Sequence, residues 1–242
     1  MFNLNRHIHG FTLAEVLITL GVIGVVAVMT IPTLIQKTQE QELVNRWFKT
    51  YAMLQNAIKL AEEDCGDSST WTWKTYMNNN TNLDTEGSAY ACMKPYLKIV
   101  SDCPTGGAAC FLTKNDDYSF LDNKPASYCN YYGPAVKLIS GETICFSGGA
   151  PHFIVDLNGT SKPNKLGVDV HYFSFIDLPT RTFLPGFNWG WRDSADNAEY
   201  CNAESGWWHD GASCGFWIQR HKNMKYLHMT KEQVKKEWKT YK

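Results

Sequence analysis

The segment that decides the fold lies near the N-terminus and reads Gly10-Phe11-Thr12-Leu13-Ala14-Glu15-Val16-Leu17-Ile18-Thr19-Leu20. Glu15 is the one charged residue in it, and Val16 through Gln36 are 21 residues without a formal charge. A helix of that length measures roughly 30 Å, the thickness of the hydrocarbon core of a bilayer. The sequence therefore predicts a membrane-spanning helix. A carboxylate at its start needs a partner, because an unpaired charge is costly there.

The ten residues before Phe11 form a short polar leader. Gly10 precedes the apolar run, whereas an ordinary secretory signal is cut after its apolar core. A cut between Gly10 and Phe11 would therefore leave the hydrophobic helix on the mature protein as an anchor. Arg6 and the free amino terminus favour a cytoplasmic leader.

This pattern resembles the class III signal peptide of the type IV pilin and type II secretion pseudopilin family. The residues that carry the resemblance are Gly10, Phe11, Thr12, Leu13, Glu15 and Pro32. The resemblance implies cleavage between Gly10 and Phe11 by a prepilin peptidase, which also methylates the new amino group of Phe11. It implies that Glu15 pairs with that amino group, of its own or a neighbouring subunit, and sets the register of assembly. Pro32 then marks a stretch of helix that can unfold on assembly.

The chain is expected to be an α+β protein, in which a long N-terminal helix packs on a disulfide-bound, antiparallel β-containing C-terminal domain. Four parts are predicted: a leader at 1–10, a transmembrane and assembly helix at 11–35, its amphipathic continuation at 36–65, and an exported globular domain at 66–242.

Hydrophobic periodicity predicts one helix over 11–65 that ends near Gly66. Pro32 removes a hydrogen bond inside it, so a kink or local melting is expected there. The second half of the helix has apolar residues at steps of three and four, namely Leu43, Trp47, Tyr51, Leu54, Ile58 and Ala61.

The rest of the chain contains two predicted hairpins, a short strand and a terminal helix. The helix begins with a capping-box pattern at Thr230 and Gln233. The expected ranges are 135–139 with 142–146, 152–157 with 168–176, 216–219 for the strand and 230–241 for the helix.

All eight cysteines follow the hydrophobic helix, which suggests an oxidising compartment on that side of the membrane. We expect disulfides rather than a metal cluster, because no Cys or His set has zinc-finger spacing. Eight cysteines allow 105 connectivities. The pairs Cys103 with Cys110 and Cys201 with Cys214 are plausible local loops. The disulfide candidates are Cys65, Cys92, Cys103, Cys110, Cys129, Cys145, Cys201 and Cys214.

The stretch from Asp156 to Asp169 is a candidate calcium site. Asp156, Asn158 and Asp169 supply hard oxygen ligands, and the glycines between them allow tight turns. The segment also looks like the Asp-x-Asn-Gly…Pro-Asn…Gly-x-Asp loop of many prepilin-type proteins, and some pseudopilins bind calcium in such a loop. The alternative is an Asn-Gly hairpin whose side chains cap their own backbone. No other cofactor is expected.

Five of the nine tryptophans fall within 29 residues, namely Trp189, Trp191, Trp207, Trp208 and Trp217. If exposed, they would offer stacking platforms for a sugar. If buried, they would supply the hydrophobic mass of a small disulfide-bound domain. An alternative function is therefore a membrane-tethered or tip-located module that recognises a surface glycan.

The formal net charge of −1 argues against a nucleic-acid partner. No catalytic motif is present, so an enzyme is not expected. The resemblance implies a structural subunit of a type IV pilus or type II secretion pseudopilus. It implies as partners a prepilin peptidase, other pilin or pseudopilin subunits, an inner-membrane assembly platform and membrane lipid. The chain would cross the bacterial inner membrane once, export its C-terminal domain and enter a filament on assembly.

Overall fold

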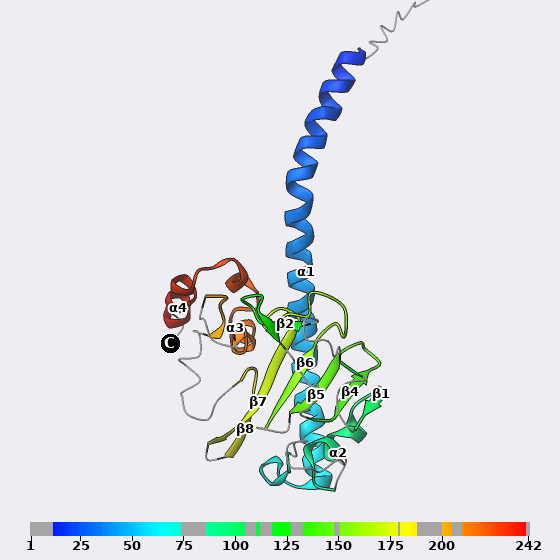
Figure 1. Cartoon of the computed structure of the whole chain (residues 1–242), viewed down its shortest axis with the longest axis vertical. Helices are drawn as coiled ribbons and strands as arrows, with labels where there is room; N and C mark the ends of the chain where they lie inside the picture. Colours follow the sequence, from blue (N-terminus) through cyan, green and yellow to red (C-terminus); the bar gives the residue numbers. More distant parts are fainter. Residues whose placement is uncertain are drawn as a thin grey trace, which may run out of the picture. The chain divides into compact units, whose positions relative to one another are not determined.

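A computed structural model describes residues 12–73, 86–104, 110–111, 118–126, 133–147, 151–178, 180–187, 200–204 and 210–240 (Figure 1). The chain divides into two compact units, Met1–Gln41 and Glu42–Lys242. The helices are α1 (Leu13–Cys65), α2 (Ala89–Met93), α3 (Cys214–His221) and α4 (Lys231–Thr240), with short 3-10 turns at η1 (Ser68–Thr70), η3 (Lys94–Tyr96) and η6 (Lys225–His228).

The strands form one six-stranded antiparallel sheet and a small two-stranded one. The large sheet has the order β1-β4-β5-β6-β7-β8, so β4 to β8 form a meander and β1 adds to its edge. Its strands are β1 (Ile99–Cys103), β4 (Ala135–Leu138), β5 (Thr143–Ser147), β6 (His152–Asp156), β7 (Val170–Leu178) and β8 (Thr180–Leu184). The small sheet pairs β2 (Tyr118–Ser119) with β3 (Pro125–Ala126).

The predicted helix is confirmed as the single element α1, which is helical through Pro32. The local melting expected at that proline is not present. The apolar stripe of the second half is also confirmed, because Trp47, Leu54 and Ala61 are fully buried. Gly66 follows the last helical residue, and its backbone N–H donates to the Glu62 carbonyl.

The part of α1 from Glu42 onward packs on one face of the sheet through aromatic rings. The Trp47 and Phe173 ring centroids lie 5.6 Å apart, and the Tyr51 ring stacks on Phe173 at 5.9 Å and on Phe183 at 5.5 Å. Alternate residues of the strands, such as Phe153 and Phe173, face this cluster. Period-two alternation therefore places the core between the helix and the sheet.

The opposite face of the sheet is covered too. Ile154, Val170 and Tyr172 belong to a second buried cluster with residues of β2, β3 and the later loops, such as Tyr118 and Phe187. With both faces covered, all five residues of β6 are buried.

Both predicted hairpins and the terminal helix are confirmed. The capping box at the start of α4 is present, with the Thr230 N–H donating to Gln233 Oε1 at 2.8 Å. The strand predicted at Phe216–Gln219 is wrong, because these residues lie in α3. Trp217 and Ile218 are fully buried on one side of α3, so tertiary packing overrides the β-propensity of the Phe-Trp-Ile sequence.

Disulfide bonds join Cys65 to Cys92, Cys103 to Cys110 and Cys201 to Cys214. The two short loops proposed from sequence are therefore confirmed. Cys145 is also disulfide-bonded, and Cys129 lies outside the described residues.

We expect Gly159→Ala to destabilise the chain more than Gly66→Ala. Both glycines have positive φ, 69° and 77°, but only at Gly159 would a Cβ meet a backbone atom, the Gly141 carbonyl oxygen at 2.7 Å. The left-handed conformation costs an alanine about 1–2 kcal/mol, and the close contact should add about 1–3 kcal/mol. Denaturant titration of the full chain in detergent measures both. Equal losses would contradict the assigned contact.

Candidate functional site

The first candidate site is the N-terminus of α1, where Thr12 and Glu15 form a capping box. Glu15 Oε2 accepts hydrogen bonds from the Thr12 backbone N–H at 2.8 Å and from Thr12 Oγ1 at 2.9 Å. The Glu15 N–H donates to Thr12 Oγ1 at 3.2 Å. The carboxylate thus lies in the first turn of the helix, where the helix dipole favours an anion.

Sequence reasoning missed this cap, although the Thr-x-x-Glu pattern that signals it stands in the quoted segment. Gly10 and Phe11 lie outside the described residues, so the pairing of Glu15 with the Phe11 amino group remains a prediction. The cap holds the carboxylate at the end of the helix nearest Phe11.

The surface around Glu15 is apolar and uncovered. The large apolar side chains from Leu13 to Ile35 are 41–78% exposed. This is the one described helix long and apolar enough to cross a membrane. Such a surface needs hydrocarbon or other helices around it.

The second candidate site is the loop between β6 and β7. Asp156, the last residue of β6, pairs with Val170 at the start of β7, and this register places Asp156 close to Asp169. Both residues are fully buried. Asp156 Oδ2 accepts from the Tyr118 hydroxyl at 3.0 Å, and Oδ1 accepts from the Asn158 N–H at 3.2 Å. The Asp169 oxygens accept from the N–H groups of Asn164 and Lys165 at 2.8 and 2.7 Å.

The pKa of Asp156 is raised to about 8, mainly because the carboxyl group is buried and also because the Asp169 carboxylate lies nearby. Burial also raises the pKa of Asp169. Two carboxyl groups so close to one another in the protein interior favour either a bound proton or a cation.

The third predicted ligand, Asn158, donates from Nδ2 to the Lys162 carbonyl at 3.3 Å. Its Oδ1 atom is buried and has no hydrogen-bond partner among the described residues, and the same is true of Asn164 Oδ1. Asn164 was not predicted as a ligand. Two carboxylates and two unpaired amide oxygens are donors of the kind that Ca²⁺ prefers. Among the described residues, no group of three or more His, Cys, Asp or Glu side chains is placed to hold a metal.

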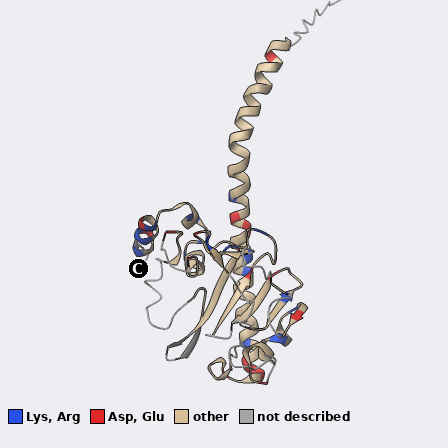
Figure 2. Cartoon of the chain, viewed as in Figure 1, with Lys and Arg blue, Asp and Glu red and all other residues tan. Residues whose placement is uncertain are grey.

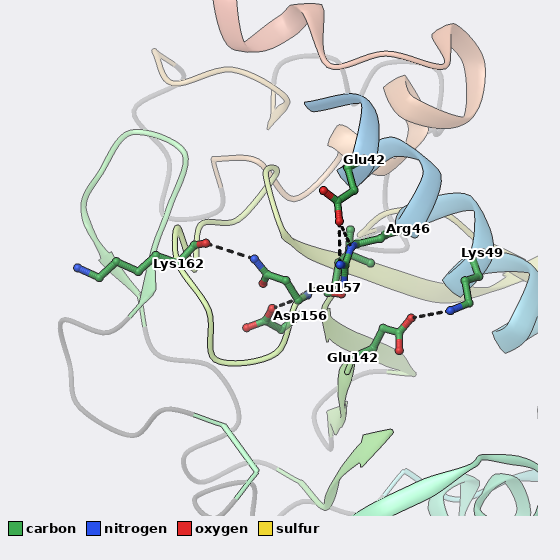
Figure 3. A network of polar contacts seen from close by, with 8 residues as sticks. Glu42, Arg46, Lys49, Glu142, Asp156, Leu157 and Lys162 are labelled. Atoms are coloured by element: carbon green, nitrogen blue, oxygen red, sulfur yellow. Dashed lines mark hydrogen bonds and ion pairs between the residues drawn. The ribbon is translucent and has the colours of Figure 1, made fainter. Parts of the chain in front are cut away.

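The same loop is also held by the structure around it. The Ser119 N–H donates to the Asn164 carbonyl at 3.0 Å, and the Tyr226 hydroxyl donates to the Gly167 carbonyl at 2.6 Å. Arg46 of α1 reaches the Leu157 carbonyl at 3.5 Å while it pairs with Glu42 (Figure 3). The loop therefore connects β2, η6 and α1. The backbone-capping alternative is supported by the bonds from the N–H groups of the same loop to Asp156 and Asp169.

The tryptophan-rich region offers no described sugar platform. Trp217 is fully buried against His221 and Trp238, with ring centroids 4.1 and 6.3 Å away. Trp189, Trp191, Trp207 and Trp208 lie outside the described residues. The glycan alternative therefore depends on residues other than Trp217.

Residues 5–31 match the prokaryotic N-terminal methylation motif. With the long N-terminal helix, the antiparallel sheet and the disulfides, this motif defines a precursor of the type IV pilin and pseudopilin class. The motif implies processing by a prepilin peptidase and assembly with other pilin subunits.

Residues 33–205 match a family of unknown function (DUF6613), and the chain belongs to that family. No curated protein and no solved structure matches the chain.

With divalent metals chelated, we expect the free energy of unfolding to fall as pH rises from 6.5 to 8.5. The folded pKa of Asp156, about 8, lies above its ordinary value of 3.8, so the folded state binds the extra proton. That stabilisation is complete below pH 3.8 and is lost as pH rises through 8. The slope should reach at most about 1.4 kcal/mol per pH unit.

Denaturant titrations of the full chain across this pH window measure the slope. The pKa of His171, lowered to about 4 by burial, lies below the window. Asp156→Asn is the matched control and should flatten the slope. The assignment fails if wild type and Asp156→Asn have the same pH dependence.

Proposed function

We propose that the chain is a structural subunit that a prepilin peptidase cuts between Gly10 and Phe11 and methylates at Phe11. The mature protein then assembles through α1 into a type IV pilus or a type II secretion pseudopilus. The observation that carries the proposal is the methylation motif on a helix whose large apolar side chains are exposed from Leu13 to Ile35.

Membrane lipid covers this apolar surface before assembly, and the helices of other subunits cover it afterwards. An inner-membrane assembly platform moves the subunit from one environment to the other. In this proposal the leader stays in the cytoplasm and the domain from Glu42 onward is exported. The three described disulfides support export, because such bonds persist in oxidising compartments. A structural role also accounts for the absence of a catalytic motif in the sequence.

Glu15 supplies the register of assembly in this scheme. Before assembly the carboxylate caps its own helix through Thr12. In the filament it would also meet the amino group that cleavage creates on Phe11 of a neighbouring subunit. Because an unpaired charge is strongly disfavoured in a low-dielectric surround, subunits that are out of register are penalised.

Two substitutions separate the charge of Glu15 from its capping role. Glu15→Gln keeps a capping side chain but removes the charge, whereas Thr12→Ala removes the cap and keeps the charge. Glu15→Gln should still insert into the membrane but lower filament yield at least roughly tenfold, the factor that 1.4 kcal/mol represents. Thr12→Ala should retain most of the yield.

Sheared filaments are weighed and their subunits analysed by intact mass. Wild-type subunits should have the mass of residues 11–242 plus one methyl group. An uncut leader in wild type would refute the processing step, and normal filaments from Glu15→Gln would refute the ionic register.

We propose further that the loop between β6 and β7 binds Ca²⁺ through Asp156 and Asp169, with amide oxygens from Asn158 and Asn164. Burial of both carboxylates and the two unpaired amide oxygens support this proposal. A bound cation would offset the repulsion between the carboxylates and tie the loop more firmly to its neighbours.

Extracellular calcium modules have dissociation constants of up to about 1 mM. Calcium at that concentration should therefore produce a calorimetric binding signal and raise the Tm of the full chain. The double variant Asp156→Asn with Asp169→Asn should lose both effects. Lys162→Ala, which removes a side chain of the same loop that supplies no ligand, should keep them. Absence of heat and of a Tm change in wild type would refute the site.

A further inference from the structure

The last two helices carry an excess of positive charge. Residues 214–240 contain seven Lys or Arg and two Glu, a net charge of +5, whereas the whole chain has a net charge of −1. We call the lysines of this segment the basic surface; they are Lys222, Lys225, Lys231, Lys235, Lys236 and Lys239. Figure 2 shows the positive charge gathered on α4.

The packing of α4 leaves its Lys236 and Lys239 exposed. Val234 and Trp238 form its buried side, and the Arg220 guanidinium covers the Trp238 ring at 4.7 Å. Lys225 and Lys239 are exposed, and among the described residues neither side chain has a hydrogen bond or an ion pair. The charges of Lys225 and Lys239 are therefore available for a partner.

A surface of opposite charge lies at the C-terminal end of α1. We call it the acidic surface; it comprises Glu62, Glu63, Asp64 and Asp67, and residues 60–73 contain no Lys or Arg. Glu62 and Asp64 accept hydrogen bonds from Ser68 and Tyr96, and Glu63 is exposed. The carboxylates of Glu62, Glu63 and Asp64 form no ion pair with any other described residue. Leu60, one turn earlier, is 44% exposed.

The two surfaces are offset along α1. A Cβ at Gly215 of α3 would lie 3.4 Å from the Trp47 ring, so α3 meets α1 at that level. Glu62 follows Trp47 by fifteen residues, which is about 22 Å of helix. In Figure 1 the last turns of α1 lie beside α2, at the end of the domain away from α3 and α4. One chain therefore does not bring its own two surfaces together.

We propose that the basic surface of one subunit docks on the acidic surface of a second copy of this chain, shifted along the α1 axis. This inference rests on the proposed function, since it requires subunits with parallel helices. A contact between two different patches is head-to-tail and extends into a filament rather than closing a dimer. Complementary charge orients the subunits, and Leu60 adds exposed apolar surface at the contact.

A zero-length carbodiimide cross-linker, applied to wild-type filaments before proteolysis and mass spectrometry, tests the contact directly. It should join Lys235, Lys236 or Lys239 to Glu62, Glu63 or Asp64. The detergent-solubilised, unassembled chain should lack these links. Filaments of mature subunits without them overturn the inference and leave the proposed function intact. If wild type forms no filament, both fall.

Charge reversal gives an independent test of the same contact. Lys225→Glu with Lys239→Glu should lower filament yield at least roughly tenfold, and so should Glu63→Lys with Asp64→Lys. The four changes together should restore most of the yield. Lys98→Glu with Lys162→Glu, which reverses two exposed lysines elsewhere, is the control of equal charge and should leave the yield unchanged.

Each variant is first shown to unfold at the wild-type temperature, so that a loss of yield reports on assembly. A combined variant that stays as defective as each pair overturns the inference. So does a basic-surface variant that assembles normally but no longer binds duplex DNA or anionic vesicles, because the lysines would then serve a nucleic acid or a lipid.

Discussion

Trp47 and Tyr51 of α1 pack on Phe173 and Phe183 of the sheet, and this contact joins the helix to the sheet in the unit from Glu42 onward. Aromatic rings bury large areas and prefer a limited set of geometries, so they set both the distance and the orientation of the helix against the strands. The opposite face of the sheet is then free to bury Tyr172 with the later loops. The β6–β7 loop is held in turn between α1 and the C-terminal helices.

The same helix has two environments, and the difference between them connects the fold to the proposed function. Up to Ile35 the large apolar side chains are exposed, whereas from Val44 onward one face is buried in the core. An exposed apolar surface of that length must be covered by lipid or by other helices. Membrane anchoring and filament assembly are two ways to satisfy one physical requirement, and Glu15 and Phe11 would select the register in the second.

Many helices, hairpins and disulfide loops could be predicted from the sequence, because they depend on interactions between residues close to one another in the chain. Helix periodicity, the hairpin of 135–139 with 142–146, the Thr230 and Gln233 capping box, and the short loops closed by Cys103 with Cys110 and Cys201 with Cys214 each depend on residues close in sequence. Edge strand β1 and the last strand β8 were missed, since each is defined by the strand it pairs with. Phe216–Gln219 was predicted as a strand from the β-propensity of its Phe-Trp-Ile sequence. The residues are helical in α3 because they pack against partners that are distant in sequence.

Composition and local order in the sequence therefore determined the apolar N-terminal helix, its charged start, the pilin-like class and two of the disulfide pairs. A run of apolar residues, a lone charge at its start and the spacing of cysteines can be recognised without knowledge of the fold. Tertiary structure alone decided that Asp156 and Asp169 are fully buried, and that the amide oxygens of Asn158 and Asn164 in the same loop are buried with no hydrogen-bond partner among the described residues. It also decided that Trp217 is core rather than a platform, and that the basic and acidic surfaces stand apart along α1. Burial, desolvation and charge separation depend on groups far apart in sequence, and only the folded chain brings those groups together.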